Sequence, residues 1–145
     1  MSLDPQWLTA TLKYEGLPLA LRVRPSVDKE LTSLKPHLAS VSHILEKTRE
    51  DGMPESSYNN SLADFDAFVH ESLPHPGAEM MIVETFDGRR TYYACFEAEQ
   101  EYEKWVAQLR ASYPQHALEE QFDHEIIIQH TSHDIQSILC SPFQI

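Results

Sequence analysis

Residues 79–96 read EMMIVETFDGRRTYYACF, and this stretch decides the fold. Two apolar runs flank Asp87-Gly88, and an Asp-Gly pair in that position is a strong signal for a β-hairpin because glycine readily adopts the positive φ of a type I′ turn. The sequence therefore predicts two antiparallel strands, residues 79–86 and 89–96, joined by a two-residue turn.

The two-residue turn also predicts which side chains share a face of this hairpin. Ala94 leaves room for a helix to approach, so we expect the face that carries Ala94, Val83 and Tyr92 to pack against helices. The opposite face combines polar side chains in mid-strand with an apolar patch that needs a cover. The residues that we expect there, as a protein-binding face, are Met80, Ile82, Glu84, Thr91 and Tyr93.

An amphipathic helix is predicted on each side of this hairpin, because apolar residues recur at the spacing of one helical face. The first begins near Ser56 or Ser57, either of which can cap it, and the second ends before Pro114. The apolar positions are Leu62, Phe65, Val69 and Leu73 in the first helix, and Tyr102, Val106, Leu109 and Tyr113 in the second.

Four further strands complete the pattern. Residues 7–25 alternate in polarity on both sides of Glu15-Gly16, which predicts an N-terminal hairpin. A third strand is expected within 37–47 and a last one near 118–122. From residue 37 the order is then strand, helix, strand, strand, helix, strand, which is the ferredoxin-like βαββαβ arrangement of the α+β class, with both helices on one face of an antiparallel sheet.

The predicted organisation is a single domain over residues 1–145. It consists of the hairpin 7–25, a ferredoxin-like core over about 37–124, and a C-terminal tail, 125–145. The tail, the N-terminal hairpin and a partner are all candidates to cover the apolar patch, and the sequence leaves the choice open.

Net charge narrows the possible partners. The chain carries 11 Lys and Arg against 23 Asp and Glu, for a formal charge of −12, and it stays negative even with all 8 histidines protonated. Direct binding to nucleic acid or to an anionic membrane is therefore disfavoured. No apolar run approaches the roughly 20 residues of a membrane span, and the N-terminus lacks an export signal, so we expect a cytoplasmic protein.

Histidine is the residue type that most suggests a metal site. Four histidines fall near the C-terminus, and His130 and His133 have a spacing that can place two imidazoles on one helical face. No HExxH or cysteine-paired pattern accompanies them, so we expect no metal, and a small metal-dependent hydrolase is the alternative. The four are His116, His124, His130 and His133.

Other catalytic patterns are missing from the sequence. Cys95 and Cys140 have no CxxC spacing and are expected to be buried, unreactive thiols. No Gly-x-Ser-x-Gly motif or glycine-rich phosphate loop is present. We therefore expect no catalytic residues and no cofactor.

Three motifs carry a resemblance to a known family: Trp7 followed by YEGLP at 14–18, DGMP at 51–54 before a helix, and DGRRTYY at 87–93. Their order and spacing resemble the bacterial family catalogued as domain of unknown function 695, over roughly residues 7–123. Members look like the N-terminal partner of a domain similar to the regulator of ribonuclease activity B, an inhibitor of ribonuclease E. The family's ending, an acidic residue, Asp-Pro and a Trp, is altered here, because QFDHEI at 121–126 keeps the acid and lacks the Pro and the Trp.

The resemblance implies a fold and a bacterial cytoplasmic setting but no reaction. We therefore expect a non-enzymatic protein-interaction or regulatory domain that binds a protein partner, or a second copy of itself, through its sheet face and acidic surface. An acidic surface suits a basic patch. Together with the family's association, this suggests a link to RNA-processing enzymes, whose basic sites such a surface would occupy as a mimic of nucleic acid.

Overall fold

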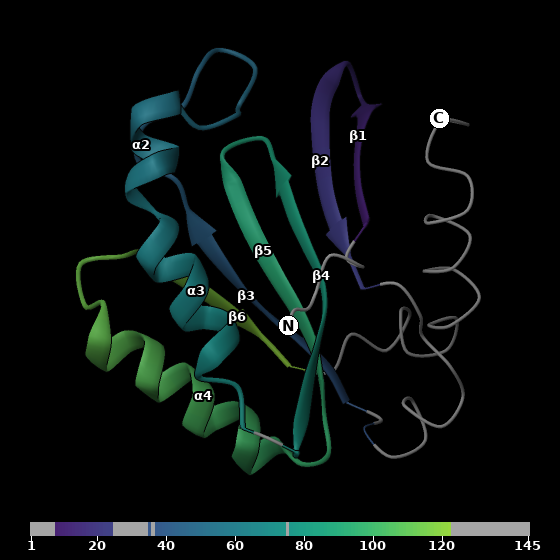
Figure 1. Ribbon diagram of the computed structural model, residues 1–145, viewed down its shortest axis with the longest axis vertical. Coiled ribbons are helices and arrows are strands. Elements are labelled where there is room, and N and C mark those ends of the chain that lie inside the picture. The colour runs from purple at the N-terminus through teal and green to yellow at the C-terminus, as the bar shows by residue number, and fades with distance from the viewer. Residues whose placement is uncertain (1–7, 25–34, 36, 75, 123–145) are drawn as a thin grey trace.

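Six strands form one antiparallel sheet in the computed structural model, which describes residues 8–24, 35, 37–74 and 76–122. The strand order is β1-β2-β4-β5-β3-β6, and the helices lie together on one face of the sheet (Figure 1). Among the described residues, no helix has the length and apolar character needed to cross a membrane. The elements are β1 (Leu8–Tyr14), β2 (Leu17–Val23), β3 (His37–Ile44), α2 (Ser56–Ser61), α3 (Ala63–Glu71), β4 (Ala78–Phe86), β5 (Arg89–Phe96), α4 (Glu99–Ser112) and β6 (Leu118–Gln121).

Both predicted hairpins are confirmed, together with their turns. Asp87 and Gly88 have φ values of 49° and 84°, and Glu15 and Gly16 have φ values of 52° and 82°. Positive φ at both central positions is the type I′ pattern, whose twist matches that of the flanking strands. Each turn therefore has two residues, closed by Tyr14 opposite Leu17 in one hairpin and by Phe86 opposite Arg89 in the other.

The N-terminal hairpin lengthens the sheet instead of folding over it. β2 pairs with β4 in antiparallel register, from Leu19 opposite Phe86 to Val23 opposite Ile82. β1 lies beyond β2, at the end of the strand order. The strands of this hairpin are thus part of the sheet and are not the cover of its helix-free face.

A β-bulge in β4 overturns one predicted position. Ile82 pairs with Tyr93 as expected, but Met80 pairs with Ala94 instead of Cys95, so Met81 is the extra residue. One extra residue reverses the alternation of side chains beyond it. The prediction that Met80 lies on the helix-free face is therefore wrong, since Met80 is buried in the core beneath the helices.

The larger core lies between the sheet and the helices. Phe65 of α3 and Trp105 of α4 are almost fully buried there, next to Tyr92 of β5. The indole N–H of Trp105 donates a hydrogen bond of 3.1 Å to the carbonyl oxygen of Val69. The indole N–H is the only polar group of the Trp105 side chain, and this bond satisfies it. The bond also joins α4 to α3 at the centre of the core.

The helical segment before the hairpin needs a correction. A continuous helix capped by Ser56 or Ser57 is predicted, whereas α2 and α3 are separated at Leu62, which has φ −89° and ψ 1°. Glu55 precedes α2, and no side-chain hydrogen bond caps it. The predicted apolar stripe is nevertheless confirmed, because three of its members are buried and the fourth packs against the core. They are Leu62, Phe65 and Val69, with Leu73.

A second apolar cluster lies on the helix-free face. Its buried members are Leu12, Leu21, Val23, Leu38, Met81 and Cys95. Ile82 and Tyr93 are half-buried and pack against it. Because the large apolar side chains described in β1 and β2 share this face, the hairpin turns its small and polar side chains toward the side on which the helices lie. The predicted tail, 125–145, is outside the described residues.

The tip of the β4–β5 hairpin rests on the loop that precedes α2. The backbone N–H of Gly88 donates to the carbonyl oxygen of Gly52 at 2.8 Å, and the N–H of Leu45 donates to the carbonyl oxygen of Gly88 at 2.9 Å. Gly52 has a φ of 85°, and a Cβ atom added to it would lie 2.7 Å from Cα of Asp87. Only glycine fits this backbone contact without a shift of the hairpin tip.

Gly52→Ala and Gly16→Ala separate backbone strain from this contact. Both glycines have positive φ, but a Cβ atom at Gly16 would meet nothing within 4 Å. We expect Gly16→Ala to lower the free energy of unfolding by about 1–2 kcal/mol, the cost of a left-handed conformation for an L-residue. Gly52→Ala should cost at least about 1 kcal/mol more, because the hairpin tip must move. If urea unfolding gave the same loss of unfolding free energy for Gly52→Ala and Gly16→Ala, the contact between Gly52 and the hairpin tip would be contradicted.

Candidate functional site

A groove of about 440 Å³ lies where the N-terminal hairpin extends the sheet beside the helices. Its floor includes Thr9 and Thr11 of β1 and Ala20 of β2, and α2 and α3 form its wall through Asn59 and Ala63. The apolar residues of β1 and β2 point to the other face, so short side chains remain here. The groove is therefore a consequence of the alternation in the hairpin.

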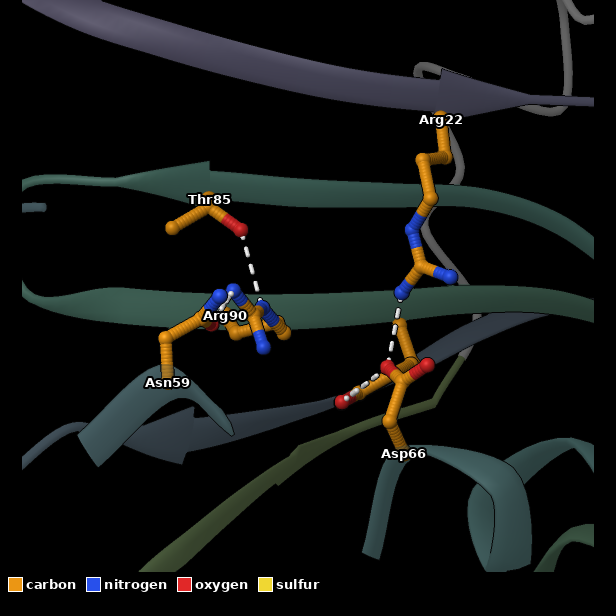
Figure 2. A network of polar contacts seen from close by, with 6 residues as sticks. Arg22, Asn59, Asp66, Thr85 and Arg90 are labelled. Carbon is orange, nitrogen blue, oxygen red and sulfur yellow. Dashed lines mark hydrogen bonds and ion pairs between the residues drawn. The ribbon is translucent and has the colours of Figure 1, made fainter. Parts of the chain in front are cut away.

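Two arginines from different strands converge on this groove. Arg22 comes from β2 and Arg90 from β5, and both line it together with Asp66 of α3. Figure 2 shows Arg22 reaching from its strand toward Asp66, while Arg90 lies between Asn59 and Thr85. The chain has only 11 Lys and Arg, so two arginines at one groove form a local concentration of positive charge.

Asp66 ties Arg22 to the centre of the sheet. Nη2 of Arg22 donates to Oδ1 of Asp66 at 2.7 Å, and the hydroxyl of Tyr92 donates to the same oxygen at 2.9 Å. Burial alone would raise the pKa of Asp66, but the hydrogen bond and charge of Arg22, with the bond from Tyr92, lower it overall. Asp66 is therefore ionised at neutral pH and offsets the charge of Arg22.

Arg90 is held in a different way, by neutral acceptors. Its Nε donates to the hydroxyl oxygen of Thr85 at 3.0 Å, and its Nη2 donates to Oδ1 of Asn59 at 2.8 Å. Across the described residues it forms no ion pair with a carboxylate. The groove therefore contains two arginines and one aspartate, and it is positive within a chain whose formal charge is −12.

The predicted protein-binding face is only partly brought together. Ile82, Glu84, Thr91 and Tyr93 share the helix-free face, and Met80 does not. The hydroxyl of Thr91 shares a 2.8 Å hydrogen bond with Ser42 of β3. Burial raises the pKa of Glu84, and burial together with the charge of Glu84 raises the pKa of Tyr93 to about 12. This face is less open than predicted, and its binding of a partner stays a prediction.

The histidines take a structural position in the described part of the chain. His43 of β3 is only 1% exposed, and its ring stacks on His116 with the ring centroids 4.6 Å apart. Among the described residues, its ring nitrogens have no hydrogen-bond partner. Burial, with the charges of His116 and Arg90, lowers the pKa of His43 to about 4. The described residues hold no group of three or more potential metal ligands. His124, His130 and His133 lie outside them.

The thiol of Cys95 is buried, as predicted. Burial is the main reason that its pKa rises to about 12. At neutral pH the side chain is therefore a neutral thiol, which is a weak nucleophile. Cys140 lies outside the described residues.

Sequence reasoning missed the groove because its residues are far apart along the chain. Arg22 and Asp66 are 44 positions apart, and Arg90 and Asn59 are 31 positions apart. One signal was available, since Arg22 is a charged residue between Leu21 and Val23 in an alternating strand. Its parity placed it on the helix side of the sheet, where a charged group needs a partner.

No model of a known protein family matches this chain, and searches of curated proteins and of solved structures also find no match.

The buried His43 predicts a loss of stability in mild acid. Its pKa is about 4 in the folded chain, compared with 6.5 for an unperturbed histidine, so the unfolded chain takes up the proton first as the pH falls. The stability contributed by neutral His43 should be complete above about pH 6.5 and should decline toward pH 4, by up to about 3 kcal/mol. Urea unfolding at a series of pH values measures this decline.

His43→Leu should make that pH profile shallower and leave stability at pH 7 unchanged or higher, because the ring nitrogens have no partners to lose. The slope that remains between pH 6.5 and 4 comes from His70 and His116, whose pKa values are also lowered, whereas Asp66 contributes only below about pH 4. His37→Gln, on the same strand, is the control. If His43→Leu had the same slope of unfolding free energy against pH as the native chain, His43 would not be the cause of the acid sensitivity.

Proposed function

We propose that the protein is a non-enzymatic interaction domain that binds a partner protein at the groove between the N-terminal hairpin and α2–α3. The observation that carries this proposal is the pair of arginines that line a groove of about 440 Å³, each held in place by hydrogen bonds. Arginine is enriched among the residues that dominate binding energy at protein interfaces. A groove that presents two of them suits the recognition of a partner's side chain.

The arginines are held in place before any partner arrives. Arg22 is fixed by an ion pair to a helix, and Arg90 by hydrogen bonds to Thr85 and Asn59. The side chain of Arg22 is nevertheless 38% exposed, so it remains within reach of a ligand. Side chains that are already ordered lose less conformational entropy on binding, which favours affinity.

The acidic surface adds long-range attraction to a basic partner. Glu97, Glu99 and Glu103 are exposed around the start of α4, on a chain with a formal charge of −12. We propose that this surface steers the domain toward a basic patch, of the kind found on RNA-processing enzymes, while the groove provides the specific contact. Association should then slow and weaken as salt is added.

The proposal extends to the architecture and the family. The four neighbours β4-β5-β3-β6, all antiparallel, support a ferredoxin-like core to which β1 and β2 are added at the β4 edge. We propose, on the motifs at 14–18, 51–54 and 87–93, that the chain is related to the bacterial family of domain of unknown function 695. A cytoplasmic location and a protein partner or second copy are part of the same proposal.

Filling the groove tests this function. Thr11→Trp places a large side chain on the exposed edge strand that forms the floor, where tryptophan is well tolerated in a β-strand. Gln108→Trp adds the same bulk at an exposed position of α4, outside the groove. Both variants and the native chain are immobilised and exposed to lysate of the cells that encode the protein, at low and high salt, and retained proteins are quantified by mass spectrometry.

We expect Thr11→Trp to lose at least about 90% of a partner that Gln108→Trp retains, since an occluded anchor typically costs more than 1.4 kcal/mol. The native partner should also be released at high salt. Equal retention by both folded variants would show that the groove is not the binding site. Retention that is unaffected by salt would remove the role of the acidic surface.

A further inference from the structure

We infer that the group recognised in the groove is a single carboxylate, and that Arg90 is the residue that binds it. This inference rests on the proposed function, because it names the chemistry of the group that occupies the same groove. It concerns the free acid of a small molecule or the acidic side chain of a peptide, since both present the same group.

The first argument is the balance of charge. Asp66 offsets Arg22 through a 2.7 Å ion pair, whereas the partners of Arg90 are the neutral Thr85 and Asn59. One positive charge in the groove is therefore uncompensated within the described residues. A carboxylate carries one negative charge, and a phosphate group at neutral pH carries nearly two. The formal charge of −12 on the whole chain further penalises multiply charged anions.

The second argument is the geometry of the guanidinium. Arg90 donates one hydrogen bond from Nε toward β4 and one from Nη2 toward α2 (Figure 2). They orient the planar group, and within the described residues Nη1 has no hydrogen-bond partner. A carboxylate can approach this end and accept parallel hydrogen bonds from Nη1 and Nη2, the bidentate arrangement that arginine forms with carboxylates.

The third argument is the chemistry and size of the surrounding surface. Thr9 and Thr11 contribute hydroxyl groups and Asn60 an amide, so further donors line the same groove. Its volume of about 440 Å³ is near the small end of the range for small-molecule sites. One acidic side chain with adjacent backbone, or one small organic acid, fits this space.

The test uses the whole chain labelled with ¹⁵N and four probes. They are butyrate, inorganic phosphate, N-acetyl-glutamic acid α-amide and the matching N-acetyl-glutamine α-amide. We expect butyrate and the glutamic acid amide, which each carry one carboxylate, to shift the Nε–H signal of Arg90 and the side-chain amide signal of Asn59 in a saturable way. The glutamine amide should bind at least about tenfold more weakly, because it lacks the charge. Phosphate should bind more weakly than butyrate.

Neighbouring arginines provide the matched variants. Arg90→Gln should weaken binding of butyrate at least about tenfold. Arg89→Gln, one residue earlier on the opposite face of β5 and paired with Glu119, should leave it unchanged. Thermal unfolding of each variant establishes that it is folded.

Asp66→Asn provides a second, independent test. It removes the charge that offsets Arg22 and leaves an acceptor for Tyr92, so the groove gains one positive charge. The ratio of phosphate affinity to butyrate affinity should then rise severalfold relative to the native chain, because phosphate carries the larger negative charge. An unchanged ratio would contradict the charge argument even if Arg90→Gln is unstable.

Three results would overturn the inference: equal binding of butyrate by native protein and Arg90→Gln, tighter binding of phosphate than of butyrate to the native chain, or no shift with any carboxylate. If Thr11→Trp abolishes partner binding but the native chain binds no carboxylate, the proposed ligand class is wrong and the proposed function still stands. With the inference upheld, tighter binding of the glutamic acid amide identifies a peptide source, and tighter binding of butyrate identifies a free acid.

Discussion

One carboxylate oxygen joins three elements of this fold. Oδ1 of Asp66, on α3, accepts hydrogen bonds from Arg22 on β2 and from Tyr92 on β5. The helix layer is thereby connected both to the centre of the sheet and to the hairpin added at its edge. Removal of any one partner leaves a partly buried charge or hydroxyl without its bond, which costs more than the bond itself contributes.

The sheet has two apolar faces, and this explains where the groove lies. One face packs against α3 and α4 around Phe65 and Trp105, while the other carries the cluster that includes Leu21 and Val23. Each side chain of a strand points to one face of the sheet, and successive side chains point to opposite faces. Since β1 and β2 direct theirs away from the helices, they leave threonine, alanine and arginine beside α2 and α3. A hairpin with the opposite parity would have filled the groove with leucine.

Local patterns predicted most of the fold. The Asp87-Gly88 turn, the apolar stripe with Phe65 and Val69, and the alternation of the first hairpin each depend on neighbours a few residues apart, and each is confirmed. The interruption at Leu62 was not predicted, because the apolar spacing continues through it while the backbone leaves the helix. Periodicity reports which side a residue faces and is insensitive to a break of one residue.

Local sequence patterns could not predict the candidate site. It depends on pairs such as Arg22 with Asp66, whose proximity follows from the pairing of β2 with β4 and not from spacing in the sequence. The sequence also contained no sign that Met81 would be the extra residue in its strand, because two consecutive methionines suit either face. Side-chain parity can therefore be read from the sequence only up to the first bulge.

That bulge also bears on how the chain can change length. An insertion or deletion within a strand ordinarily exchanges its two faces, so it is rarely tolerated where both faces are apolar. On either side of Met81, however, the pairs Met80 with Ala94 and Ile82 with Tyr93 are already those of an uninterrupted ladder. Loss of this one residue would leave every other side chain of β4 on its present face. Residue 81 is thus a position in the central hairpin at which descendants of this sequence can differ in length without an exchange of the two faces, although the cluster on the helix-free face would lose the buried side chain of Met81.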